Sequence, residues 1–407
     1  MKPVNRTAVG ALVVAELVSV LGSRMTYLAL PWFVLVTTGS PGKMSIVLAV
    51  QIAPMALLGI PSGSLVQWLG GRTTMLLSDL ARVPLMAAIP LLYSFGVLSF
   101  PLLLGFVFVL GAFMPPYFAS QRVVLPELVG EDEGLMAQAN SAIEGGSGLA
   151  GLCGPALAGL LIPFLGAPNV LYVDAGTFLA SFVIVLALVP RRRPLRVPAQ
   201  RGLLAGLQFV LRDGLLGPIA VTVVGFGLIG SALSAALPVF AFDAFGGSSR
   251  IAGLFYASLA AGALAGSIAA MFVVRRIAPL RLAGLAILAF AAPLWLLPFH
   301  PPAATVIVAL FAAMFFAPFV NGPVFGVLTA RTPEQLRPKV MTAVISLNTV
   351  AAPLGFLAAG QAIERWGVTS VFAAVPAGIT ILALVFASIA LRHRAEDVVP
   401  AAQPVAV

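Results

Sequence analysis

Charged side chains are scarce in this 407-residue sequence. Asp, Glu, Lys and Arg make up 9% of the residues, against about 25% in typical soluble domains. Apolar residues account for 60%, and the mean hydropathy is +1.07. This composition excludes a soluble globular protein and indicates an integral membrane protein. The net charge of +9 does not indicate nucleic-acid binding, because the cations are spread over short segments without a soluble domain to organise them.

Cysteine and histidine are almost absent. The single cysteine, Cys153, excludes a disulfide within the chain. The only histidines, His300 and His393, lie far apart in sequence, which excludes a paired-histidine metal site and a catalytic triad. The segment Gly39–Met44 is only superficially similar to a phosphate loop, because the first glycine and the Ser or Thr after lysine are missing. We therefore expect neither an enzyme nor an ATP-driven pump, and no metal or cofactor.

Twelve apolar stretches are long enough to cross a membrane. A helix needs about 20 residues to cross a hydrocarbon layer of about 30 Å, where unpaired backbone amides exclude irregular structure. The stretches cover 8–36, 44–68, 74–95, 99–121, 136–163, 168–189, 214–242, 251–274, 281–298, 303–329, 340–363 and 369–391. The sequence therefore predicts an all-α integral membrane protein with twelve transmembrane helices. The first stretch is too long for a cleaved signal peptide and lacks a cleavage site, so we expect it to be retained.

The two halves of the sequence repeat one another. The segment Ala29–Phe33 recurs as Ala236–Phe240, at an offset of 207 positions. A half-length repeat is typical of transporters built from two similar bundles. We predict two pseudo-symmetric six-helix bundles: an N-terminal bundle at 1–189, a cytoplasmic linker at 190–213, and a C-terminal bundle with a short cytoplasmic tail at 214–407.

Positive charges indicate the orientation, because positively charged loops stay on the cytoplasmic side of a membrane. With both termini inside, the predicted cytoplasmic segments hold 19 of the 23 Lys and Arg residues. Only Lys43, Arg250 and Arg365 fall outside, and Arg24 lies within the first stretch. We expect a multi-pass protein of the plasma or inner cell membrane with both termini cytoplasmic, and we favour a monomer.

Several motifs resemble those of the major facilitator superfamily. Gly63–Arg72, in the predicted connection between the second and third helices, resembles its signature loop, with Gln67 where the family usually has Asp. Ala150–Gly159 is similar to the Gly-Pro-x-x-Gly-Gly motif of exporter branches. Together with Leu125–Val129 and Pro353–Gly360, these motifs resemble the branch that includes macrolide-efflux proteins and the enterobactin exporter. The resemblance implies proton antiport by alternating access, exporting an amphipathic small molecule such as a drug, a macrolide or a siderophore-like compound.

Small and charged residues near the predicted inner rim are gate candidates. The resemblance implies that small residues of the signature loop let two helices approach while charges latch the gate. Asp79 and Arg82, three residues apart, offer a substitute ion pair on the same rim. On the fifth helix, Pro155 removes a hydrogen bond and neighbouring glycines allow close contact, as a rocking hinge requires. The gate and hinge candidates are Gly63, Gly70, Arg72, Asp79, Arg82, Gly154, Pro155 and Gly159.

Ionisable side chains inside the apolar stretches are candidates for proton coupling, because a charge at the bilayer centre costs about 2.5–3.5 kcal/mol. Glu144 is the first choice, since it lies deep in the fifth stretch, where an apolar setting disfavours the ionised form. Glu16 and Asp174 are the further candidates. The arginine that the family usually embeds in its fourth helix is absent here, and Arg122 lies only at the end of that stretch. Coupling therefore needs another position.

In the superfamily, helices one, four, seven and ten usually line the substrate cavity. Aromatic and methionine side chains adapt to varied apolar ligands, and a few polar groups orient them. The resemblance implies these substrate-facing candidates: Arg24, Tyr27, Phe113, Met114, Tyr117, Phe315, Phe316 and Asn321. Two other functions stay open. One is a proton-coupled importer or facilitator, because the fold supports either direction, and the other is a non-transporting membrane sensor or scaffold.

Overall fold

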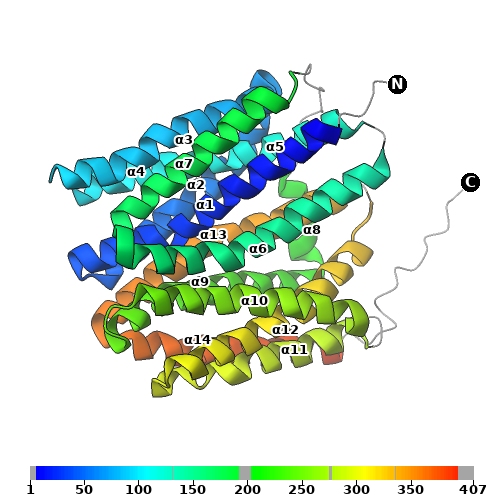
Figure 1. Cartoon of the computed structure of the whole chain (residues 1–407). Helices are drawn as coiled ribbons and strands as arrows, with labels where there is room; N and C mark the ends of the chain where they lie inside the picture. Colours follow the sequence, from blue (N-terminus) through cyan, green and yellow to red (C-terminus); the bar gives the residue numbers. More distant parts are fainter. Residues whose placement is uncertain (1–5, 131, 192–202, 275–276, 335, 393–407) are drawn as a thin grey trace, which may run out of the picture. The chain divides into compact units, whose positions relative to one another are not determined.

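The computed structural model describes residues 6–130, 132–191, 203–274, 277–334 and 336–392 (Figure 1). In these ranges the regular elements are all helices, and 12 are long and apolar enough to cross a membrane. This confirms the prediction of an all-α membrane protein with twelve transmembrane helices. Part of the predicted linker, 192–202, lies outside the described residues.

The helices group into two compact units. Unit 1 comprises Met1–Ala199 and Leu237–Ala257, and unit 2 comprises Gln200–Ala236 and Ser258–Val407. Unit 1 contains α1 (Arg6–Thr38), α2 (Pro41–Leu69), α3 (Gly71–Ser94), α4 (Phe100–Ala112), α5 (Met114–Val129), α6 (Glu133–Leu165) and α7 (Ala167–Leu188). Leu237–Ala257, which the sequence places in the C-terminal bundle, groups with unit 1, and the predicted bundle boundaries stay a prediction.

Unit 2 begins with a short helix and is otherwise built from long apolar ones. Two helices are divided between the units: α9 belongs to unit 1 from Leu237 on, and α10 up to Ala257. The elements are α8 (Leu203–Arg212), α9 (Leu216–Ala244), α10 (Ser249–Val273), α11 (Pro279–Leu294), the 3₁₀ turn η2 (Leu297–Phe299), α12 (Ala303–Arg331), α13 (Arg337–Trp366) and α14 (Val368–Arg392).

The fourth membrane span consists of two helices. α4 ends at Ala112 and α5 begins at Met114, with Phe113 between them. Pro115 and Pro116 follow at once and have no backbone N–H, so they cannot continue the α-helical hydrogen bonds. The span runs on to Val129 rather than to the predicted end at 121. The interruption therefore lies within the span.

Single glycines join three pairs of helices. Gly70 connects α2 to α3 with φ of 83°, Gly166 connects α6 to α7 with φ of 84°, and Gly367 connects α13 to α14 with φ of 76°. L-residues with a side chain rarely adopt such positive φ values, whereas glycine adopts them readily. The predicted signature loop is therefore mostly helical, and Gly63 lies inside α2.

Candidate functional site: a buried polar cluster and an apolar groove

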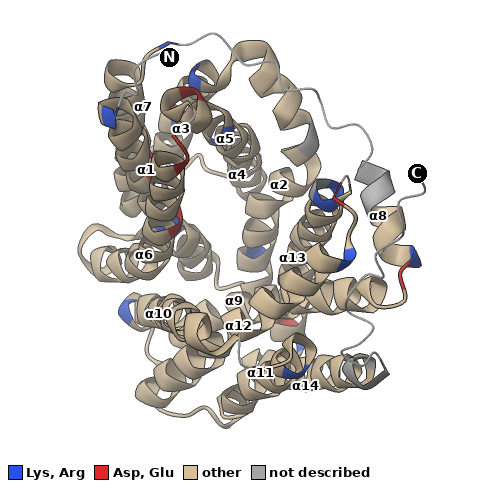
Figure 2. Ribbon diagram, turned by 90° about the vertical axis from the view of Figure 1, so that its right-hand side faces the viewer, with Lys and Arg blue, Asp and Glu red and all other residues tan. Residues whose placement is uncertain are grey.

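Ionisable and polar side chains meet in the interior of unit 1. They come from α1, α3, α5 and α7, whose packing brings α1 against α5 and α7, and α3 against the same two helices. Glu16, Asp79, Arg82, Tyr117 and Ser181 each expose 4% of their surface or less. Figure 2 shows acidic positions, in red, along the helices around α1 and α3. We call these five residues the buried polar cluster.

The predicted ion pair between Asp79 and Arg82 is present, with 2.5 Å between Arg82 Nη2 and Asp79 Oδ1. Ser181 Oγ donates to the other carboxylate oxygen, Oδ2, at 2.7 Å. The guanidinium also stacks against two rings, 4.6 Å from the centroid of Tyr117 and 4.2 Å from that of Phe178. The ion pair was expected on the cytoplasmic rim near the start of α3, and the structure buries both side chains. Asp79 lies about 12 Å into α3 at about 1.5 Å per residue, within the bundle.

Glu16 is the least satisfied member of the buried polar cluster. Its carboxyl group interacts with the Tyr117 hydroxyl. The second oxygen, Oε2, is buried and has no hydrogen-bond partner. Since a buried carboxylate without donors is costly, the surroundings of Glu16 suit a neutral carboxylic acid better than a charged one.

Asp174, another predicted proton carrier, is completely buried between α1 and α7. Thr26 Oγ1 donates to Asp174 Oδ2 at 2.5 Å, and Thr177 Oγ1 lies 3.1 Å from Asp174 Oδ1. A Cβ atom added at Gly22 would collide with Thr177 and Asp174, so this glycine permits the close approach of α1 and α7. Asp174 therefore ties two helices together.

Two candidates, Glu144 and Tyr117, occupy surroundings that differ from those expected, whereas the exposure of Arg24 is compatible with a substrate-facing position. Glu144 and Arg24 are exposed, on α6 and α1 respectively. Glu144 is thus not enclosed by protein, contrary to the expected burial, and its part in coupling stays a prediction. Tyr117 was expected to face the substrate cavity, but 2% of its surface is exposed because α5 turns it toward α3 and α7.

Arg72 connects α3 to the end of α7. Its Nε donates to the carbonyl of Val189 at 2.6 Å, and its Nη2 to the carbonyl of Leu186 at 2.9 Å. The last carbonyls of a helix lack partners within the helix, so a cationic donor there is favourable. Arg72 thus has a structural role, and its part in a gate stays a prediction.

The helix contact expected at Gly63 occurs at a different glycine. A Cβ atom at Gly63 would meet no atom within 4 Å. At Gly71, by contrast, it would come within 2.7 Å of Val124 Cγ2 and 3.2 Å of the Ser120 carbonyl on α5. Gly70 has the positive φ described above.

The predicted hinge residues on α6 lie at two close helix contacts within unit 1. At Gly154, an added Cβ atom would be 2.5 Å from Arg24 Cβ on α1. At Gly159 it would be 2.6 Å from the Ser249 carbonyl, and at Gly253 it would be 2.6 Å from the Pro155 carbonyl. Ser249 Oγ also donates to the Gly159 carbonyl at 3.1 Å. These small residues let α6 pack tightly on α1 and on the first part of α10.

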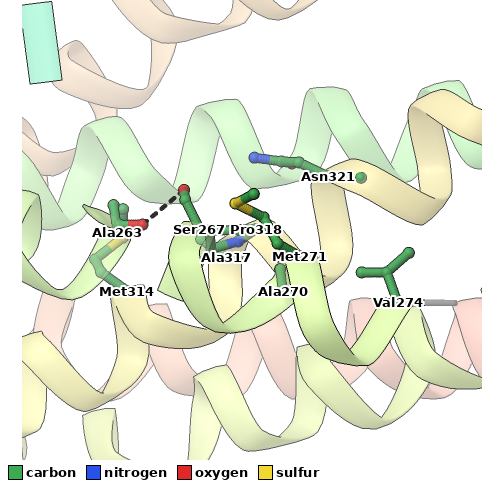
Figure 3. Close-up of a pocket in the computed structure, with 10 residues that line it drawn as sticks. Ala263, Ser267, Ala270, Met271, Val274, Met314, Ala317, Pro318 and Asn321 are labelled. Carbon is green, nitrogen blue, oxygen red and sulfur yellow. Dashed lines mark hydrogen bonds between the residues drawn. The ribbon is translucent and has the colours of Figure 1, made fainter. Parts of the chain in front are cut away.

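Unit 2 contains an uncharged groove with a volume of about 680 Å³ between α10 and α12. Figure 3 shows its lining, including the hydrogen bond from Ser267 to the Ala263 carbonyl at 2.8 Å. Beside it, Gly262 and Gly266 allow the backbone of α12 to approach closely at Phe311 and Phe315. The lining residues are Ala263, Ser267, Ala270, Met271, Val274, Met314, Ala317, Pro318, Asn321 and Gly322.

The groove contains one of the predicted substrate-facing residues, Asn321, whose side chain is exposed. Phe315 and Phe316 are half-buried beside it and form a ring pair with centroids 5.4 Å apart. In unit 1, Tyr27 and Tyr256 form a ring pair at 5.8 Å, and Phe113 and Met114 are half-buried at the α4–α5 junction. The candidates are thus divided between the units, and their contact with substrate stays a prediction.

Sequence reasoning missed several partners of the site. On α7, Asp174, Thr177 and Ser181 recur at intervals of three and four residues, which places them on one helical face. This polar stripe in an otherwise apolar helix was a readable signal for Ser181. Phe178 and Met271 carried no such signal, because an apolar residue in a membrane helix has the same pattern whether it faces lipid or protein.

Comparisons with known proteins agree with this architecture. The family model described as transmembrane secretion effector matches residues 1–405. The chain belongs to this family of major facilitator superfamily transporters. Members are transporters rather than enzymes, and this chain is a multi-pass membrane transporter.

Relatives of this family member include pumps from mycobacteria. The multidrug efflux pump Tap of Mycolicibacterium fortuitum is 28% identical over 382 residues, covering 91% of this chain and 93% of that protein. Tap of Mycobacterium tuberculosis (strain ATCC 25618 / H37Rv) is 26% identical over 403 residues, covering 95% and 94%.

Solved structures show the same fold at low sequence identity. The nucleoside transporter NupG superposes with a TM-score of 0.76 at 13% identity, covering 95% of this chain and 100% of that one. A bacterial homologue of the human lysosomal transporter Spinster, in an inward-facing and occupied conformation, gives 0.76 at 14% identity, covering 98% and 99%. These likenesses establish the fold alone.

Proposed function

We propose that this protein is a proton-coupled antiporter that exports amphipathic small molecules across the cell membrane by alternating access. The observation that carries the proposal is Glu16, a buried carboxyl group with an unpartnered oxygen inside a transmembrane bundle. The relatives of this protein that are named multidrug efflux pumps support export as the direction of transport. Both termini are proposed to be cytoplasmic.

Glu16 has the properties that a proton carrier needs. In the present surroundings it is better accommodated with a proton than without one, because one oxygen has no donor. A state that admits water or repositions a cation would accommodate the ionised form. Protonation would then favour one access state over the other, which is the requirement for coupling.

The groove of unit 2 supports an amphipathic substrate. Its lining is apolar apart from Ser267 and Asn321, and none of the lining residues is ionisable. Met271 and Met314 have flexible, polarizable side chains that adapt to differently shaped apolar ligands. We propose that the apolar body of a substrate contacts the methionines while Ser267 and Asn321 orient its polar group. The other proposed substrate-facing residues are Arg24, Tyr27, Phe113, Met114, Phe315 and Phe316.

Transport in proteoliposomes tests proton coupling. A fluorescent amphipathic cation such as ethidium serves as the probe, and an imposed pH gradient is the only driving force. Because Gln mimics a protonated Glu, Glu16→Gln should lose uphill accumulation but retain exchange of probe across the membrane. Glu144→Gln makes the same chemical change at an exposed position and should keep both activities.

Three results would contradict the proposal. Uphill accumulation by Glu16→Gln at the parent rate would exclude Glu16 as the carrier. Loss of accumulation only in Glu144→Gln would identify Glu144, the first candidate from the sequence, as the proton carrier. In oriented vesicles, proton-driven movement of the probe toward the cytoplasmic face would indicate an importer.

A further inference from the structure

The hydroxyl groups of the buried polar cluster determine a direction of hydrogen bonding. Ser181 Oγ donates its single proton to Asp79, so at its 3.4 Å contact with the Tyr117 hydroxyl it can only accept. Tyr117 must then donate its own single proton to Ser181. The Tyr117 hydroxyl also contacts the Glu16 carboxyl group, and there it has no proton left to give.

A proton on Glu16 supplies the donor that is missing between Glu16 and Tyr117. We infer that the buried polar cluster is a directional hydrogen-bond chain, in which protonated Glu16 donates to Tyr117, Tyr117 to Ser181, and Ser181 to the Asp79–Arg82 ion pair. The inference rests on the proposed proton coupling and adds the residues through which it acts. Tyr117, Ser181 and the ion pair are positioning residues that relate the proton on Glu16 to the packing of four helices.

Loss of the Glu16 proton changes every link of the hydrogen-bond chain. An ionised Glu16 only accepts hydrogen bonds, so Tyr117 must turn its proton toward it and release Ser181. Arg82 is then the one cation shared by two carboxylates, because Asp79 and Glu16 both interact with its charge. Sharing weakens the 2.5 Å Asp79–Arg82 pair within α3, whose Asp79 also accepts the hydrogen bond from Ser181 of α7. The proton is thereby linked to the contact between these helices.

The charged and titratable groups around Glu16 are few. Asp79 and Arg82 come from α3, and Tyr117 comes from α5. Asp174 of α7 interacts with the same ion pair. Of the other described charged residues on the helices packed against α1, four are exposed and one is half-buried: Lys43 on α2, Arg122 on α5 and Glu133 and Glu144 on α6 are exposed, and Glu127 on α5 is half-buried. Arg82 is therefore the buried cation of the described residues that interacts with Glu16.

Opposite charge deletions should move the pH dependence in opposite directions. The measurement is uphill accumulation of ethidium at a constant pH difference while the absolute pH is varied. Arg82→Gln removes the cation, so Glu16 keeps its proton to higher pH and the alkaline midpoint should rise by about one pH unit. Asp79→Asn leaves Glu16 as the acidic partner of Arg82, so the midpoint should fall by about one pH unit.

Further variants separate this effect from damage to the fold. Asp79→Asn/Arg82→Gln removes both charges and should return the midpoint toward that of the parent, with a larger yield of folded protein than either single variant. Arg82→Lys keeps the charge and should keep the parental midpoint at a lower rate. Arg331→Gln is the matched control, since Arg331 pairs with Asp213 at 3.6 Å in a partly exposed position, and it should leave the profile unchanged.

The outcomes distinguish this inference from the proposed function. A parent protein without pH-driven accumulation refutes proton coupling itself. If the parent is coupled but the alkaline midpoints of the two single variants shift in the same direction, or do not shift, the inferred hydrogen-bond chain is wrong. If the single variants do not fold, a midpoint displaced by about one pH unit in Arg82→Lys or in the double variant overturns it equally.

Discussion

Two buried carboxyl groups in unit 1 differ in how completely their oxygens are hydrogen-bonded. Asp174 contacts the hydroxyl groups of Thr26 and Thr177 through different oxygens. Glu16 has a hydroxyl partner for one oxygen and none for the other. A carboxyl group with a hydroxyl contact at each oxygen stabilises one arrangement of helices, whereas one with an unpartnered oxygen changes its protonation more readily. We therefore assign Asp174 to structure and Glu16 to proton exchange.

The structural part of this assignment can be tested at Thr26. Thr26→Val keeps the shape of the side chain but removes the donor to Asp174. Leaving a buried acceptor with one partner fewer should lower the free energy of unfolding by about 1–3 kcal/mol. Thr349→Val is a suitable control, because Thr349 is only half-buried and bonds to the Ile345 carbonyl of its own helix. Equal thermal stability of both variants in detergent would show that the Thr26 contact contributes nothing.

The sequence identified the right residue types but not their surroundings. Glu16, Asp79, Arg82 and Asp174 stand out because ionisable residues are rare in membrane helices. Which of them is buried depends on helix rotation, and the hydrophobic pattern does not report rotation when lipid and protein interior are equally apolar. For the same reason Glu144 looked buried from its neighbours, yet it is exposed.

Close helix packing in this protein depends on particular glycines rather than on every glycine of a motif. Gly71, Gly154 and Gly159 each leave less than 3 Å between an added Cβ atom and a neighbouring helix. Gly63, in the segment that resembles the signature loop, has open space around it. A motif gives the small residues, and only the positions of the neighbouring helices decide which are needed.

Two alanine substitutions should separate these cases. At Gly71 an added methyl group meets Val124 and the Ser120 carbonyl on α5, so Gly71→Ala should destabilise the protein by about 1–3 kcal/mol through overpacking. Gly63→Ala adds a methyl group in open space within α2 and should be neutral or stabilise by up to about 1 kcal/mol. Thermal unfolding of both variants in the same detergent measures the difference, and a less stable Gly63→Ala protein would contradict it.

Helix positions were largely predictable, because each span must contain enough apolar residues to cross the bilayer. The predicted stretch 8–36 corresponds to Arg6–Thr38, and 303–329 to Ala303–Arg331. The end of α5 was missed, since polar Gln121 and Arg122 suggested the end of a span while the helix continues to Val129. A helix can continue past polar residues wherever its backbone hydrogen bonds are kept.

Across the whole chain, the distribution of cations predicts which ends of the helices face the cytoplasm. We expect the end of α9 at Ala244 to face outward and the short helix α8 to lie inside. In a protein with Cys153 replaced, Ala244→Cys should react with a membrane-impermeant maleimide in intact cells. Gln208→Cys should react only after permeabilisation. Both positions are exposed, so access to the reagent is set by the membrane. The reverse pattern would invert the orientation.

Among the described residues, the buried charges are divided unequally between the two units. Their buried charged side chains, Glu16, Asp79, Arg82 and Asp174, all belong to unit 1. The groove in unit 2 has no ionisable lining residue. This separation has an evolutionary consequence. Under the proposed function, mutations along α10 and α12 would change the range of exported compounds while the residues proposed for proton coupling stay intact, so resistance to a new toxin would arise without a new coupling mechanism.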